Sequence, residues 1–595
     1  MIVSRSRSRY SVLVISLIIL SAVYCEANDF FYQTSTRQPH IIVILADDLG
    51  WNDVGFHGSD EIRTPNIDAL AYNGVILHRH YSMATCTPSR AALLTGRYPI
   101  RLGMQGTPIA AGMKLGIPLN ETLLPQHLKH LGYKTSLVGK WHVGCYRKDM
   151  LPTKRGFDSF FGYYNGYIGY YDGMHIDSGV GGLDARRGDS PAWHELVARY
   201  ATEVLTQEAS DVIRQHANQS QPLFLEVSHL APHAGNVGGR LQVPNPIQTE
   251  KEFAHIGDSK RRVFAGMVKE LDNSVGEIVQ ALNKAKMLED SIIVFLSDNG
   301  APTVEPVWQT GNSGSNWPLR GEKASLHEGG IRTVGAIWST RIARSSTIYN
   351  QNFHLVDWLP TLYAAAGGDT SNLTGIDGVN HWDSISGLEP SQELAKPNRT
   401  LLLNIDDVEG ATALMHGRWK LIKNNATSRL SFTNGYFGAG GKGPNTPPYN
   451  ITSVLDSQVG QILSKLNPNP QSKMADTFLQ LRSQSTVSCP NLTTAIHPDN
   501  ECYKSHCLYD LESDPCESEN LLEKLPELGK TMKRLLENFE KQIRPRPPYI
   551  FDEAALPKNF DNYWAVWVGS GNSSMNLSQN YLLVLLSFLC ILGYR

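Results

Sequence analysis

The sequence of 595 residues has almost no net charge. Its 54 Lys and Arg residues nearly balance its 57 Asp and Glu residues, for a formal net charge of -3. Such a chain lacks the overall basic field that attracts nucleic acid or an anionic polysaccharide, so we expect no nucleic-acid partner, and any anion site has to be local. No internal repeat is apparent, which excludes a repeat array. What remains is a globular composition, 41% hydrophobic and 19% charged, long enough for a large domain and a smaller one.

Hydrophobic runs at the two ends of the chain are too short for a comfortable bilayer span. Near the start, three arginines precede an apolar run over residues 12–23, the layout of a cleaved secretory signal over residues 1–25. Near the end, an apolar stretch over residues 581–594 follows a polar spacer and a trio of small residues. This layout resembles a signal for a glycosylphosphatidylinositol (GPI) anchor over residues 571–595, and a hydrophobic tail that stays in place is the alternative.

Several acceptor sites for N-linked glycans agree with entry into the secretory route. They are Asn120, Asn218, Asn372, Asn398, Asn425, Asn450 and Asn491. Together with the signal, they predict a glycoprotein that resides in the lysosome, outside the cell or at the cell surface, where a GPI anchor would attach it to the membrane.

Cysteines are few, and only eight occur in the whole chain. Two of them, Cys25 and Cys590, leave with the terminal segments if these are removed. Four others lie close enough in sequence to form two local disulfides, whose connectivity the sequence leaves open, with Cys145 unpaired. These four are Cys489, Cys502, Cys507 and Cys516. A zinc site built from them is the alternative, which an oxidising compartment disfavours.

Four apolar runs typical of buried strands stop abruptly at ionisable residues. They are residues 41–45 before Asp47 and Asp48, 135–138 before Lys140 and His142, 223–227 before His229 and His233, and 292–296 before Asp298 and Asn299. Helical patterns over residues 123–131 and 264–282 lie between them, so we expect an α/β fold with a largely parallel sheet. In such sheets ligands bind beyond the carboxyl ends of the strands, and this edge would bring Asp48 and Asp298 together.

Three carboxylates and an amide oxygen at one edge need a cation. Hard oxygen ligands favour Ca²⁺ or Mg²⁺ over zinc, and the flexible coordination of Ca²⁺ makes it the predicted ion. A single Asp after a strand more simply caps a turn or a helix, but that reading does not explain four charged strand ends together.

Residues 86–90, Cys-Thr-Pro-Ser-Arg, form the most informative segment of the chain. Taken alone, Cys86 could be a buried thiol, half of a disulfide or a metal ligand. A phosphatase-type thiolate would need a longer spacing to Arg90. We expect a short helix that starts near Pro88 and stops at Gly96, and the start of such a helix presents free backbone donors to an anion.

The chain resembles the type I sulfatases, in which the cysteine of such a segment is oxidised to formylglycine. The segments that carry the resemblance are residues 44–50, 86–97, 138–142, 231–233, 297–300 and 320–330. Residues 144–163, 435–436 and 447–452 look most like arylsulfatase B and its close relatives.

The resemblance implies the alkaline-phosphatase-like sulfatase fold, with a large, mostly parallel sheet flanked by helices. A catalytic domain would span residues 38–400, and a C-terminal subdomain of antiparallel sheet plus helix would span residues 401–560. Within that subdomain the sequence predicts a strand over residues 418–422, a loop over 434–450 and an amphipathic helix over 521–541.

The resemblance also implies a set of site residues. One Ca²⁺ per chain would be bound by Asp47, Asp48, Asp298, Asn299 and the formylglycine made from Cys86. The sulfate pocket would be lined by Arg90, Lys140, His142, His233 and Lys323. The histidine segment, residues 228–233, departs from the His-Glu-Pro of arylsulfatase B. Its Ala-Pro-His ending is widespread in the broader family, so we favour His233 as the catalytic histidine and expect His229 to be a structural neighbour.

These residues predict hydrolysis of a sulfate ester. A hydroxyl of the hydrated aldehyde at residue 86, held by Arg90 and made more acidic by calcium, would attack sulfur. His233 and Lys323 are the candidates to protonate the leaving oxygen, and His142 would then deprotonate the second hydroxyl so that sulfate is expelled. Arg90, Lys140 and Lys323 would balance the charge on the sulfuryl oxygens.

The predicted activity is that of an arylsulfatase-type sulfuric ester hydrolase acting on a sulfated glycan or aryl sulfate. Similarity to arylsulfatase B suggests 4-sulfated N-acetylgalactosamine units of dermatan or chondroitin sulfate, and hence glycosaminoglycan degradation. Maturation would require a formylglycine-generating enzyme. The alternatives are a non-catalytic, surface glycan-binding protein with a sulfatase fold, and a phosphatase or phosphodiesterase of the same superfamily. The first is disfavoured because no expected polar group is missing, and the second because neither a Ser or Thr nucleophile nor a two-zinc site is evident.

Overall fold

The computed structural model describes residues 37–236, 239–303, 311–388, 394, 398–424, 438, 440, 443, 445–467, 469–489, 502 and 505–569. The predicted signal over residues 1–25 and the predicted anchor signal over residues 571–595 lie outside the described residues. So do Asn425, Asn491 and residues 435–436.

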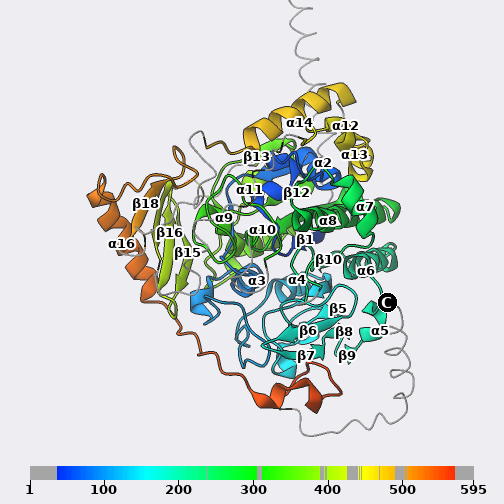
Figure 1. Ribbon diagram of the computed structural model, residues 1–595, viewed down its shortest axis with the longest axis vertical. Helices are drawn as coiled ribbons and strands as arrows, with labels where there is room; N and C mark the ends of the chain where they lie inside the picture. The colour runs from blue at the N-terminus through cyan, green and yellow to red at the C-terminus, as the bar shows by residue number, and fades with distance from the viewer. Residues whose placement is uncertain are drawn as a thin grey trace, which may run out of the picture.

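A ten-stranded sheet forms the centre of the larger part of the molecule (Figure 1). Its order is β13 (Thr347–Tyr349), β2 (Val75–Leu77), β12 (Gly335–Ser339), β11 (Ser291–Ser297), β1 (His40–Ala46), β10 (Leu223–Ser228), β4 (Lys134–Lys140), β5 (Ser159–Tyr163), β8 (Ala185–Arg187) and β9 (Ser190–Pro191). The four apolar runs predicted as strands are β1, β4, β10 and β11, each slightly longer than predicted.

The sheet is mixed, and its parallel part is the centre. Strands β11, β1, β10, β4 and β5 are parallel neighbours, whereas β12 pairs antiparallel with β11, and β8 pairs antiparallel with β5. All strands of this sheet except β12 and β8 run in the same direction, so the expectation of a largely parallel sheet is confirmed. Between β11 and β12 the described residues form only the short helix α9 (Glu328–Ile331), with no long crossover helix, so the strand returns in the opposite direction.

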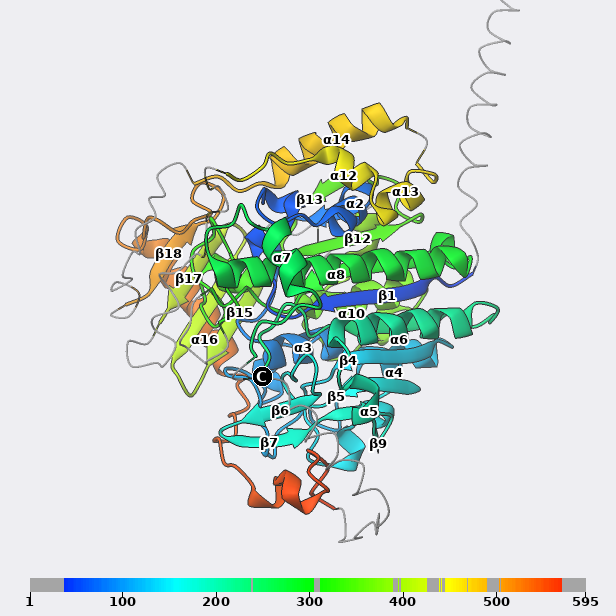
Figure 2. The same ribbon diagram turned by 45° about the vertical axis from the view of Figure 1, so that its right-hand side comes forward.

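Alternate residues of each central strand enter two different cores. Ile42 and Ile44 of β1 pack in the core under α2 (Pro65–Asn73), α6 (Ala201–His216) and α8 (Ser259–Lys284). Ile41, Val43 and Leu45 pack in the opposite core under α3 (Cys86–Thr95), α4 (Leu124–His130) and α10 (Trp358–Ala365). Figure 2 shows α6 and α8 lying along β1. Because both faces are covered, β1 and β11 are apolar over most of their length, and the residues of the cluster described below lie at or just beyond the strand ends; β10 is an exception, with Glu226 buried in its middle.

Helix α3 begins two residues earlier than predicted. It starts at Cys86 and ends before Gly96, which caps the helix in the left-handed conformation with φ 65°. Proline has no N–H and is tolerated in the first turn, where that N–H would have no partner, so Pro88 need not be the first residue. Cys86 therefore lies within the first turn of the helix.

The smaller domain is a four-stranded antiparallel sheet covered by one long helix (Figure 1). Its strands are β15 (Thr400–Asp406), β16 (Ala411–His416), β17 (Trp419–Lys423) and β18 (Cys507–Asp510). The helix is α16 (Pro526–Glu540), which buries Met532 and Leu536 and starts later than the predicted residue 521 because Pro526 occupies its first turn.

The two predicted local disulfides are confirmed, with their connectivity. Cys489 pairs with Cys516 and Cys502 with Cys507, which leaves none of these four for zinc. Among the described cysteines, Cys86 and Cys145 are free.

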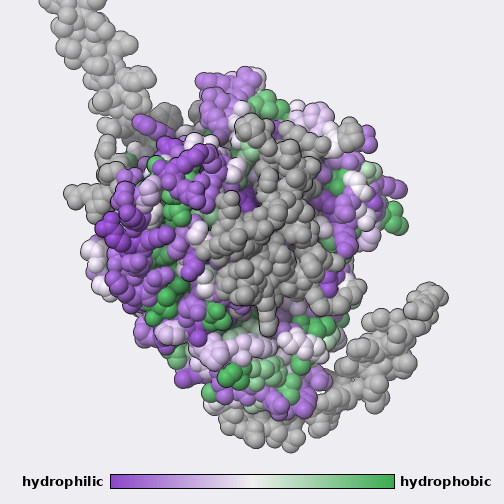
Figure 3. Space-filling view, turned by 60° about the vertical axis from the view of Figure 1, so that its left-hand side comes forward, coloured by the Kyte–Doolittle hydropathy of each residue, from purple (hydrophilic) through white to green (hydrophobic). Residues whose placement is uncertain are grey.

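Two later segments return to the larger domain. Helices α12 (Ile451–Leu455), α13 (Gln458–Leu463) and α14 (Gln471–Ser485) share the core of α2 and α8. The segment after α16 runs back along the large domain, where the Trp564 N–H donates to the Leu183 carbonyl at 2.9 Å. No helix of the described part of the chain is both long and apolar enough to cross a membrane. The face in Figure 3 is mostly hydrophilic, with hydrophobic side chains in small, separate groups among the coloured atoms.

Candidate active site

The carboxyl ends of β1, β4, β10 and β11 meet at one edge of the sheet, as parallel strands require. Asp47 and Asp48 follow β1, Lys140 ends β4, and Asp298 follows β11. The Asp48 N–H donates to Asp298 Oδ1 at 3.3 Å, so residues 250 positions apart are in contact. The first turn of α3 and the loop that carries Lys323 complete the cluster.

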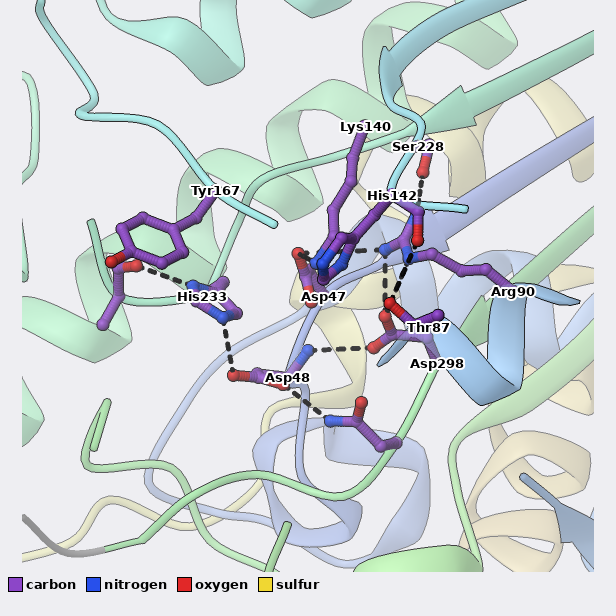
Figure 4. A network of polar contacts seen from close by, with 12 residues as sticks. Asp47, Asp48, Thr87, Arg90, Lys140, His142, Tyr167, Ser228, His233 and Asp298 are labelled. Carbon is purple, nitrogen blue, oxygen red and sulfur yellow. Dashed lines mark hydrogen bonds and ion pairs between the residues drawn. The ribbon is translucent and has the colours of Figure 1, made fainter. Parts of the chain in front are cut away.

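Three carboxylates are each paired with a basic side chain (Figure 4). Lys140 Nζ lies 2.6 Å from Asp47 Oδ2, and Arg90 Nη2 lies 2.9 Å from Asp298 Oδ2. Lys323 Nζ lies 2.7 Å from Asp48. All six side chains are buried. Three positive and three negative groups thus balance in a site shielded from water, where each interaction is stronger than it would be at the surface.

The pKa values reflect this crowding of charge. Burial raises the pKa of Asp47, but Lys140 and the neighbouring cations outweigh burial and leave that pKa below its ordinary value. Burial together with Asp47 raises the pKa of Asp298. Burial alone would lower the pKa of Lys323, yet Asp48 raises it above its ordinary value, so this lysine is charged. Further positive charge would stabilise the three carboxylates in their ionised form.

Two acceptor atoms in the cluster have no hydrogen-bond partner among the residues that the structure describes. They are Asp47 Oδ1 and Asn299 Oδ1, both buried. Asn299 Nδ2 donates to Asp48 Oδ1 at 2.6 Å, which keeps the amide beside the carboxylates. Unpaired oxygens amid carboxylates are the donor set of a hard divalent cation, so Asp47, Asp48, Asp298 and Asn299 fit Ca²⁺. Ligand atoms of Asp47, Asp48 and His233 also lie within 4.8 Å of one another, which places His233 at the border of this group.

The Cys86 thiol lies among these charges and forms no disulfide. Burial raises its pKa above the ordinary value, although Lys140 and Lys323 oppose this effect. A phosphatase-type cysteine needs a lowered pKa because the thiolate is the nucleophile. The raised pKa of Cys86 differs from this pattern.

His142 presents one nitrogen to the interior of the site. Its Nε2–H donates to the Ile109 carbonyl at 2.9 Å, so Nδ1 carries the lone pair. Nδ1 is buried and has no partner. Burial and Lys140 hold the pKa of His142 well below its ordinary value, so the ring is neutral and Nδ1 carries no proton.

The structure separates the two histidines of the 228–233 segment. His233 Nδ1–H donates to the Ala234 carbonyl at 2.6 Å, and Nε2 lies 3.4 Å from Asp48 Oδ2. Its ring stacks on Tyr167 at a centroid distance of 5.4 Å (Figure 4). His229 Nε2 instead contacts Ser274 Oγ of α8 at 2.9 Å, and burial lowers the pKa of His229 to about 4. His233 thus borders the charged cluster, whereas the His229 side chain faces α8.

Several residues of the site had not been singled out from the sequence. Ser228 accepts a hydrogen bond from Arg90 Nη1, and Thr87 Oγ1 donates to the His142 carbonyl at 3.0 Å. Ser228 ends an apolar run and Thr87 lies inside the 86–90 segment, so position in the sequence could have indicated both. Tyr167 carries no comparable signal.

Asn312 closes the site from a distant loop. Its Nδ2 donates to the Asp48 carbonyl at 3.0 Å and to the Pro232 carbonyl at 3.1 Å. The same loop approaches so closely that a Cβ at Gly50 would lie 2.2 Å from the Ser315 carbonyl oxygen, so only glycine fits there. No sequence pattern indicates this contact.

Known proteins share both the sequence and the fold. A family profile described as Sulfatase matches residues 39–368. Arylsulfatase J of Mus musculus is 35% identical over 546 residues, which cover 90% of this chain and 81% of that protein. N-acetylgalactosamine-6-sulfatase of Homo sapiens is 33% identical over 368 residues, which cover 58% of this chain and 65% of that protein. A crystal structure of Ps i-CgsB has the same fold, with a TM-score of 0.64 at 24% identity over 86% of this chain and 95% of that chain.

Loss of one carboxylate should abolish stabilisation by calcium. In the purified protein, Ca²⁺ at 100 times its Kd is expected to stabilise the fold by about 2.7 kcal/mol, seen as a higher Tm than in chelator. Asp48→Asn should lose this increment. The matched control is Asp149→Asn, a change at an exposed residue paired only with Arg147, which should keep the full increment. Equal increments in the two variants would contradict a cation site at Asp48.

Proposed function

Given that the chain belongs to the sulfatase family of sulfuric ester hydrolases, we propose that it cleaves sulfate esters of a glycan with a formylglycine made from Cys86 and one Ca²⁺. The observation that carries the proposal is the position of Cys86 in the first turn of α3, amid Lys140, Lys323, Asp47 and Asp298. Lys140 and Lys323 supply positive charge for the sulfate group. Asp47 and Asp298 supply oxygen ligands for the cation. A formylglycine-generating enzyme would act on the chain during maturation.

The cation would be held by Asp47, Asp48, Asp298, Asn299 and the modified residue 86. The two unpaired oxygens, Asp47 Oδ1 and Asn299 Oδ1, support this set. When bound, the ion supplies Lewis acidity at the site. Arg90, fixed between Asp298 and Ser228, keeps its guanidinium beside residue 86 to hold the reacting hydroxyl and a sulfuryl oxygen.

The two histidines would move protons at different steps. His142 Nδ1, neutral and without a partner, is suited to accept the proton whose removal from residue 86 releases sulfate. His233 and Lys323 are the residues that would act on the leaving oxygen. Because His233 Nδ1–H is engaged by the Ala234 carbonyl, Nε2 is the atom left to serve the leaving oxygen. It would donate a proton from the imidazolium form, which Asp48 at 3.4 Å favours although burial lowers the pKa of His233. The charged Lys323 would stabilise that oxygen as it becomes negative.

We further propose 4-sulfated N-acetylgalactosamine units of dermatan or chondroitin sulfate as the substrate. Residues 144–163 and 447–452 support it through their likeness to arylsulfatase B. One relative is named as an N-acetylgalactosamine-6-sulfatase, so the position of the sulfate has to be tested together with the sugar.

The secretory pathway is the proposed route, with lysosomal, extracellular or GPI-anchored residence at its end. Five of the predicted glycan acceptors lie in the described chain and are exposed, namely Asn120, Asn218, Asn372, Asn398 and Asn450. The two disulfides also suit an oxidising compartment.

Mass spectrometry of the peptide that contains residue 86 tests the modification. Protein from a secretory host should carry an aldehyde at this residue and hydrolyse an aryl sulfate. Cys86→Ala should fold and have no turnover. Unmodified thiol throughout, without turnover by the parent protein, would instead favour a non-catalytic glycan-binding protein.

The two histidines of the 228–233 segment provide a matched pair of variants. His233→Gln should lower kcat by roughly 10²–10⁴-fold because proton transfer to the leaving oxygen is lost. His229→Gln can keep a hydrogen bond to Ser274 and should stay close to the parent in kcat. Both kcat values are measured with the same aryl sulfate at saturation. A larger loss of kcat in His229→Gln than in His233→Gln would assign protonation of the leaving oxygen to His229.

Defined disaccharides test the substrate. The enzyme should release sulfate from 4-sulfated N-acetylgalactosamine units with a higher kcat/KM than from 6-sulfated ones, and should not act on N-sulfated glucosamine. Faster release from the 6-sulfated unit would show that the enzyme prefers sulfate at position 6. Release from N-sulfated glucosamine alone would refute N-acetylgalactosamine as the substrate sugar.

A further inference from the structure

The segment over residues 320–330, called the 320–330 loop below, leads into the first turn of α9 and holds Lys323 against the charged cluster. The Lys323 N–H donates to the Ala301 carbonyl at 3.1 Å, and the Ala324 N–H donates to the Ala84 carbonyl at 2.7 Å. Ala84 lies two residues before Cys86. The loop thereby connects the segment after β11 to the start of α3, and its own position decides where the Lys323 ammonium lies.

Glu517, from the smaller domain, contacts this loop on both sides of Lys323. Its Oε2 accepts from the Glu328 N–H at 2.7 Å and lies 3.1 Å from His327 Nδ1. Its carbonyl accepts from Arg320 Nη1 at 3.0 Å. Glu517 has no exposed surface. One residue thus fixes the beginning and the end of the loop.

Glu517 is itself held by two connections within the smaller domain. Lys420 of β17 lies 2.9 Å from Glu517 Oε1 and 2.9 Å from Glu328 Oε1, and the lysine is fully buried. The preceding residue, Cys516, is joined to Cys489 by a disulfide. Burial alone would raise the pKa of Glu517, but Lys420 and His327 hold it well below its ordinary value, so the carboxylate is charged.

Stability alone does not account for these buried charges. A buried ion pair is often no better for stability than apolar side chains of the same volume, because the charges must be removed from water. Hydrogen bonds to a charged group do, however, fix direction and distance well. The contacts of Glu517 act on the loop that carries a site residue, so placement is the function that fits them.

We propose that Glu517 is a positioning residue for Lys323, through which the smaller domain sets the distance between the Lys323 ammonium and the sulfate ester. The proposal rests on the proposed function because it assigns Lys323 a role at the leaving oxygen. Glu517 touches neither substrate nor cation, and acts only through the 320–330 loop.

A double-mutant cycle of Glu517→Gln and Lys323→Met tests the proposal. Loss of a supporting contact of this kind typically costs about 10–100-fold, so Glu517→Gln should lower kcat/KM for an aryl sulfate by that amount. If Glu517 acts through Lys323, the double variant should be no slower than Lys323→Met, within about twofold. If Glu517 only supports the fold, the two losses should multiply, and that result would overturn the proposal.

Glu512→Gln is the matched control. Glu512 lies in the same segment, is about half exposed, and pairs with Arg79 and Arg418 instead of the loop. Its variant should keep the parent kcat/KM. An equal loss in Glu512→Gln would show that the segment is sensitive to any loss of charge, and would refute a specific role for Glu517.

Two further measurements keep the test decisive. If Glu517→Gln does not fold, Glu517→Asp, which keeps the charge and shortens the side chain, replaces it in the cycle and must show the same non-additivity. Calorimetric binding of inorganic sulfate is measured for all variants. An inactive parent would refute the proposed function, whereas the positioning role would then be upheld by non-additive losses in sulfate affinity and refuted by additive ones.

Discussion

The site depends on keeping three buried carboxylates ionised at one edge of a sheet. Removing an ionised carboxylate from water costs several kcal/mol unless opposite charge replaces the water. Lys140 pairs with Asp47, Lys323 with Asp48, and Arg90 with Asp298 and, at 3.8 Å, with Asp47. The formal charges of these six groups cancel. The proposed divalent cation at the same carboxylates would make the pocket net positive, and such a pocket would attract a sulfate ester although the whole chain carries a charge of -3. The electrostatics of the pocket are therefore local.

Loops complete the site, and buried charges behind the loops hold them in place. Behind the 320–330 loop lies Glu517 with Lys420. Behind the loop of Asn312, Arg261 Nη1 donates to the Ser313 carbonyl at 3.0 Å and pairs with Asp53 at 2.6 Å. Irregular backbone cannot place a side chain as accurately as a strand does unless its own contacts are fixed. This explains why charged pairs are buried well outside the reacting centre, in both domains.

Much of the arrangement was predictable from one chain. The strands β1, β4, β10 and β11 were evident because parallel strands covered on both faces are apolar throughout, and their polar ends indicated where the site lies. Other features were not. Strand β12 is antiparallel to β11, and β8 is antiparallel to β5. The direction of a strand depends on the connection that precedes it, and an apolar run in the sequence does not indicate that direction. Tyr167 and Asn312 belong to irregular segments, and Glu517 meets Arg320 and Glu328 from 197 and 189 residues away.

The sequence by itself determined the kinds of groups at the site. Residues 86–90 and the acidic residues after the strands predict a nucleophile precursor and a ligand set for a hard cation, because chemical type and local spacing can be read from the chain. Only the tertiary structure decided which groups face one another. It turned His233 toward Asp48 and His229 toward Ser274, left His142 Nδ1 and Asp47 Oδ1 without partners, and placed Glu517 behind Lys323. The physical reason is that direction and burial arise from packing between segments far apart in the chain, which no local pattern records.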